Sequence, residues 1–163
     1  MNRPRLSPWG AIWWGGLAAG ILDLAAVVAF WAVRDVPPTA ILRSIASSLL
    51  GPAAAESGSG GALLGLLLHF AVSFAFASAY VVVSSRAPVL RARPITSGVA
   101  YGLVAYVIMT FVVVPLSRAT FDGDWPPPPV NLAASLFIHL FLFGLPIAWA
   151  ASHIGRPDTN PPA

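Results

Sequence analysis

The chain has 163 residues, of which 57 % are hydrophobic and only 9 % are charged, and its mean hydropathy is +0.77. Soluble domains carry about 25 % charged residues, so this composition excludes a water-facing globular domain and predicts an integral membrane protein. Cysteine is absent, which excludes disulfides, thiolate metal sites and cysteine nucleophiles. The net charge of +3 comes without a basic run, so we expect no nucleic-acid partner.

Four long apolar stretches follow one another along the chain. A helix needs about 20 apolar residues to cross the hydrocarbon core, and in lipid its backbone polar groups must be paired within the helix. The sequence therefore predicts an all-α integral membrane protein, a four-transmembrane-helix bundle that forms a single membrane domain over residues 1–163. The predicted spans are residues 9–33, 61–83, 95–114 and 130–151. The first stretch is longer than the apolar core of a signal peptide, and we expect it to be retained.

The connection between the first two spans contains a further predicted helix, over residues 40–50. Eleven residues are too few to cross the membrane, so we expect an amphipathic interfacial helix on the outer membrane face. Thr39 is placed to cap its start, and Gly51 can take the left-handed conformation that ends a helix. The predicted apolar face consists of Ile41, Leu42, Ile45 and Leu49.

The arginines predict the orientation of the bundle. Six lie at the N-terminus, in the second connection and at the C-terminus, whereas three lie in the first and third connections. Because cytoplasmic loops carry the excess of basic residues, both termini are expected in the cytoplasm. All nine basic residues are arginine and the chain is rich in alanine, glycine and proline, as in GC-rich bacteria. We therefore expect a multi-pass protein of the bacterial inner (cytoplasmic) membrane.

Glycines and polar residues recur on the same faces of the spans. Glycines spaced four apart allow close helix packing, and we predict this role for Gly16, Gly20, Gly65, Gly98 and Gly102. Each span also carries one polar or ionisable group near its centre, where such groups are costly and need a partner or a function. The spacing predicts one intramembrane polar cluster formed by Asp23, His69, Tyr106 and His139.

Several stretches together resemble a group of uncharacterised bacterial four-span inner-membrane proteins, labelled YagU-like. The resemblance rests on the segment from Gly16 to Asp23, the loop helix, His69-Phe70, the segment from Val113 to Ser117, and the segment from Phe143 to Pro146. It covers most of residues 10–150, through apolar motifs of low specificity. It implies a four-helix inner-membrane protein and no known reaction.

Three functions are compatible with this sequence. The preferred one is a small structural or accessory inner-membrane protein, held in the lipid bilayer and bound to a second copy or to a larger membrane protein through its small-residue surfaces. The second is a proton- or ion-handling protein that uses Asp23, His69 and His139. The third is an electron-transfer protein with a b-type haem between His69 and His139. The chain contains no GxSxG, Walker, CxxC or HExxH motif, so we expect no catalytic residues, no cofactor, no metal and no enzyme activity.

Overall fold

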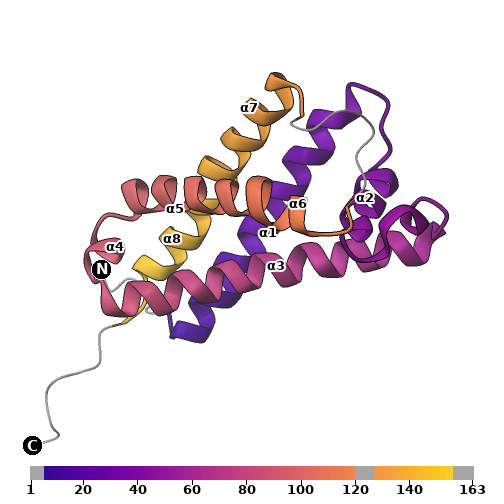
Figure 1. The fold of residues 1–163 in the computed structure, drawn as a ribbon. Helices are drawn as coiled ribbons and strands as arrows, with labels where there is room; N and C mark the ends of the chain where they lie inside the picture. Colours follow the sequence, from indigo (N-terminus) through magenta and orange to yellow (C-terminus); the bar gives the residue numbers. More distant parts are fainter. Residues whose placement is uncertain (1–5, 120–126, 156–163) are drawn as a thin grey trace, which may run out of the picture.

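The computed structural model describes residues 6–119 and 127–155, and Figure 1 shows them as a bundle of helices without a sheet. Four helical stretches in these residues are long and apolar enough to cross a membrane: Pro8–Ala32, Gly58–Arg86, Pro94–Leu116 and Pro129–Ser152. Every end lies within three residues of the predicted spans. The fold is therefore that of a multi-pass membrane protein, as predicted.

The first two spans are single α-helices, α1 (Pro8–Ala32) and α3 (Gly58–Arg86). The third consists of α5 (Pro94–Ile108), the π-helix η2 (Met109–Val113) and α6 (Val114–Leu116). The fourth consists of α7 (Pro129–Phe137), the π-helix η3 (Ile138–Gly144) and α8 (Leu145–Ser152). The short helix α4 (Val89–Ala92) joins the second and third spans.

The π-helical turns have a cause in the sequence. Each ends two residues before a proline, Pro115 in the third span and Pro146 in the fourth. Proline has no N–H, and its ring crowds the carbonyl four residues earlier. A π-turn pairs each carbonyl with the N–H five residues on, which provides a partner for a carbonyl that proline would leave unpaired. Backbone groups can then stay paired in lipid despite the prolines.

The helix between the first two spans is α2 (Pro38–Leu50), followed by the 3-10 turn η1 (Gly51–Ala54). The predicted cap was wrong: Pro37 precedes the helix, which has no side-chain cap, and Pro38 is its first residue. Proline suits this position because its φ is already helical and a first-turn N–H has no partner to lose. Gly51 ends the helix with φ +60°, but its ψ of −143° lies outside the left-handed helical region that was predicted, in a region that essentially only glycine adopts.

The side of α2 that faces the bundle coincides only in part with the predicted apolar face. Ile41, Ala46 and Ser47 are buried, whereas Leu49 is 53 % exposed. The backbone of Leu42 lies directly against Gly65 of α3. Near the C-terminal end of α2, the Ser48 carbonyl accepts a hydrogen bond from the Arg118 N–H (3.0 Å). Thus α2 packs on the N-terminal part of α3 and contacts the end of the third span, while its contact with a membrane surface stays a prediction.

The first span is central to the packing. It contacts α3 on one side and η3 and α8 on the other, and α5 packs in turn against η3 and α8. At the end opposite α2, the Leu6 N–H donates to the His153 carbonyl (2.8 Å) and the Gly155 N–H donates to the Leu6 carbonyl (3.2 Å). The two ends of the described chain are therefore joined on the same side of the bundle.

Candidate functional site

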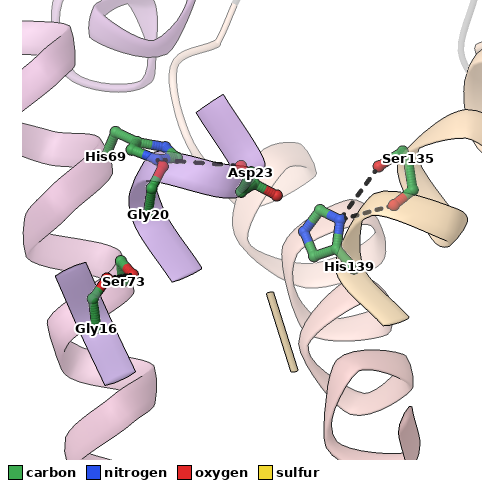
Figure 2. A network of polar contacts seen from close by, with 7 residues as sticks. All are labelled: Gly16, Gly20, Asp23, His69, Ser73, Ser135 and His139. Atoms are coloured by element: carbon green, nitrogen blue, oxygen red, sulfur yellow. Dashed lines mark hydrogen bonds and ion pairs between the residues drawn. The ribbon is translucent and has the colours of Figure 1, made fainter. Parts of the chain in front are cut away.

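Two polar side chains of α3 bind the backbone of α1. Ser73 Oγ donates to the Gly16 carbonyl at 2.7 Å, and His69 Nε2 lies 2.8 Å from the Gly20 carbonyl. The residues on each helix are four apart, so the two bonds form successive rungs between antiparallel helices (Figure 2). A carbonyl only accepts, so the Nε2 of His69 carries the proton and its Nδ1 is the acceptor nitrogen of the neutral ring.

Gly16 and Gly20 are necessary for this contact because the rings of α3 occupy the space of a side chain. A Cβ at Gly16 would lie 2.6 Å from Cδ1 of Phe74, and one at Gly20 would lie 2.7 Å from Cε1 of Phe70. Real Cβ atoms do not approach other atoms so closely. The glycine pair therefore lets the polar side chains reach the α1 backbone.

Asp23 lies one turn beyond Gly20 and is 8 % exposed. Its Oδ2 is 4.0 Å from Nε2 of His69. Its Oδ1 is buried and has no hydrogen-bond partner among the residues that the structure describes. A buried polar atom without a partner is costly, so this oxygen marks the position where a proton or a further ligand would be stabilised.

His139 approaches Asp23 from the fourth span, on the side opposite His69 (Figure 2). Its Nδ1 lies 2.8 Å from the Ser135 carbonyl and 3.5 Å from Ser135 Oγ. The proton is therefore on Nδ1, and Nε2 is the acceptor of the neutral ring.

Tyr106 of α5 completes the group from the third span. It is 8 % exposed, and its ring contacts that of His139 edge-on with the centroids 5.9 Å apart. The structure thus brings the four polar residues together in the order His69, Asp23, His139 and Tyr106, one from each span. Tyr106 contacts the ring of His139, and in the described chain it makes no hydrogen bond to Asp23 Oδ1.

The remaining predicted glycines also lie at helix contacts. Gly102 faces the backbone of His139 and Leu140, Gly98 faces Leu145, and Gly65 faces α2. Sequence reasoning missed Gly144, whose position lies against the backbones of Gly98 and Gly102. It also missed Tyr101, whose hydroxyl donates to the Phe76 carbonyl at 2.6 Å. Tyr101 follows Gly98 by three positions and so shares its inward face, a signal that was present in the sequence.

The geometry does not fit a haem between the two histidines. Helix α1 packs between α3 and η3, so Asp23 lies where the macrocycle would have to be (Figure 2). Paired imidazole ligands must face each other across an open slot between helices. Nε2 of His69 and Nδ1 of His139 instead face backbone carbonyls. Within the described residues, no group of three or more acidic or histidine side chains is placed to hold a metal ion.

No protein-family model, curated protein or solved structure matches the chain. The resemblance to YagU-like proteins therefore stays a prediction, and the function has to be argued from the site.

Proposed function

We propose that this protein handles protons in the membrane, with Asp23 as the group that binds and releases the proton. The observation that carries the proposal is the buried Oδ1 of Asp23, which has no partner in the described chain and lies beside two imidazoles. Ionisable groups inside a membrane are costly and rare, and they commonly mark proton or ion pathways. An imidazole has one donor and one acceptor nitrogen in its neutral form, so His69 and His139 are suited to exchange protons with the carboxylate.

The alternative is the structural or accessory role. It was favoured by the many small residues, which would offer packing surfaces to a second copy or a larger membrane protein. The glycine pairs of the first and third spans lie against neighbouring helices of the same chain. That packing surface is therefore used inside the bundle, and this observation moves the preference toward the polar site.

The proposed location is the bacterial inner membrane, with both termini in the cytoplasm. The support is the asymmetry of the arginines between the connections. The pairing of Leu6 with His153 and Gly155 requires only that the two ends share a side.

Proton flux in proteoliposomes containing a pH-sensitive dye tests the proposal. We expect the wild-type protein to collapse an imposed pH gradient and Asp23→Asn, which keeps the shape but cannot ionise, to lose this flux. Asp35→Asn is the matched control, because Asp35 follows the same helix and is exposed; it should retain full flux. A wild-type protein that is folded and reconstituted but gives no flux would favour the accessory role.

A further inference from the structure

Burial is distributed unevenly about the Asp23 cluster. The buried residue nearest the α2 side is Asp23 in the first span, Tyr106 in the third span and Ile138 in the fourth span. Residues 24–32, 107–116 and 129–137 contain no buried residue. In Figure 1, α7 and the end of α1 extend away from α3 and α5. The outer halves of three spans are therefore loosely packed, down to the level of the polar cluster.

The other half of the bundle is closed. On that side α8 buries a run of small and apolar residues, and α5 buries two glycines against it: Ile147, Ala148, Ala150, Ala151, Gly98 and Gly102. A Cβ at Gly98 would meet the Leu145 Cα at 2.9 Å, so the backbones of the third and fourth spans are in direct contact. The third and fourth spans are therefore packed more closely on this side than on the α2 side.

A polar stripe leads from the loosely packed end to the cluster. Asn131, Ser135 and His139 follow one another at intervals of four on the fourth span, so they share one face. All three are half-buried. Figure 2 shows Ser135 above His139, whose ring is directed toward Asp23. The opposite face of the same turns carries Ala133 and Phe137, which are exposed.

We infer that protons reach Asp23 from the α2 side of the membrane, through water held along the stripe of Asn131, Ser135 and His139. In this route, an excess proton moves along the water to Nε2 of His139, and its transfer from there to Oδ1 of the ionised Asp23 carboxylate returns the imidazole to its neutral form. The groups that face Asp23 are His69 from α3 and His139 from η3, with Tyr106 of α5 behind the latter. The inference rests on the proposed function for the identity of the exchanged species.

Thiol accessibility tests the route, and the natural chain provides the background because it contains no cysteine. Ser135→Cys replaces one oxygen by sulfur about 9 Å inside the fourth span, at 1.5 Å per residue from Pro129. A charged, membrane-impermeant methanethiosulfonate is added to sealed vesicles on the side that holds Glu56. We expect one adduct by mass spectrometry on Ser135→Cys and complete loss of this modification when the reagent is added only on the other side.

Ala133→Cys is the matched control, because it lies at nearly the same depth on the exposed opposite face. In hydrocarbon its thiol stays protonated and out of reach of the reagent, so it should remain unmodified. Ala148→Cys, in the closed half, should remain unmodified from both sides. Modification of both Ser135→Cys and Ala133→Cys, of neither, or of Ser135→Cys only from the opposite side would overturn the route. If flux requires Asp23 but Ser135→Cys is not labelled, the proposed function stands and the route is wrong. If Ser135→Cys is labelled but the wild type gives no flux, water reaches the cluster by this route and the proposed function is wrong.

Discussion

Three glycine-to-alanine variants are predicted to lose stability by different amounts, and the largest loss is expected at the contact between the third and fourth spans. At Gly102 a Cβ would meet only backbone, the His139 carbonyl and the Leu140 Cα at 2.6 Å. At Gly20 it would meet the edge of the Phe70 ring at 2.7 Å, which can turn away. At Gly60 nothing lies within 4 Å. The three variants therefore add the same methyl group against a rigid neighbour, a movable neighbour and open space.

The magnitude follows from the distance that the helices must yield. Ordinary contact begins at 3.4 Å, so Leu140 Cα at 2.6 Å is about 0.8 Å too close, and the His139 carbonyl oxygen is closer still. Opening a packed interface by about that much forfeits a quarter to a half of each dispersion contact across it. Overpacking of this kind costs about 1–3 kcal/mol, while alanine gains up to about 1 kcal/mol over glycine in a helix. We expect Gly102→Ala to lose about 2 kcal/mol and Gly60→Ala to lose nothing.

Reversible unfolding in mixed micelles of a mild detergent and dodecyl sulfate, followed by circular dichroism, measures these free energies. Gly20→Ala should fall between the other two variants, since turning Phe70 also disturbs the His69 bond to the Gly20 carbonyl. Equal stability of Gly102→Ala and Gly60→Ala would refute the close backbone contact between α5 and η3.

Two further predictions concern the rungs between α1 and α3 and the orientation. Ser73→Ala removes the hydrogen bond to the Gly16 carbonyl and should lower the free energy of unfolding by about 0.6 kcal/mol, with about 1.7 kcal/mol as the upper limit. Ser85 is the control because its hydroxyl bonds to a carbonyl of its own helix, and Ser85→Ala should leave the free energy of unfolding in the same detergent titration unchanged. Reporter fusions after Ser57 and Arg91 should be active outside and inside the cytoplasmic membrane respectively, and the reverse pattern would invert the orientation.

The spans were predictable because lipid leaves the backbone no alternative to helix, so hydropathy alone placed every end within three residues. The polar cluster was also predictable, because residues three or four apart lie on one face of a helix, and this spacing places Asp23 on the same packing face as Gly20. The direction of each bond was not. His69 Nε2 binds the Gly20 carbonyl and lies 4.0 Å from Asp23. Which of the two groups it binds depends on the exact separation of α1 and α3.

Local competition between residues accounts for the misses. Thr39 is a good capping residue, yet the helix begins at Pro38, two positions before the predicted start at residue 40. Leu49 fits the apolar pattern of α2, but the close approach of Leu42 to Gly65 fixes which side faces the bundle and leaves Leu49 exposed. Pro146 predicts a disturbed helix, but whether the result is a kink or a π-turn depends on the contacts of Gly144 with the third span.

The central place of the first span has a consequence for how the protein is made. Asp23 enters the membrane with the first helix, while His139 lies 116 positions later in the chain. At about 5–20 residues per second of synthesis, the second imidazole is made roughly 6–23 seconds after the carboxylate. During that interval His69, only 46 positions behind Asp23, is the earliest imidazole to reach it, and the Gly16 and Gly20 rungs dock the first two spans as a pair. In the nascent chain, Asp23 is therefore packed in a two-helix intermediate of the first two spans until the fourth span completes the bundle.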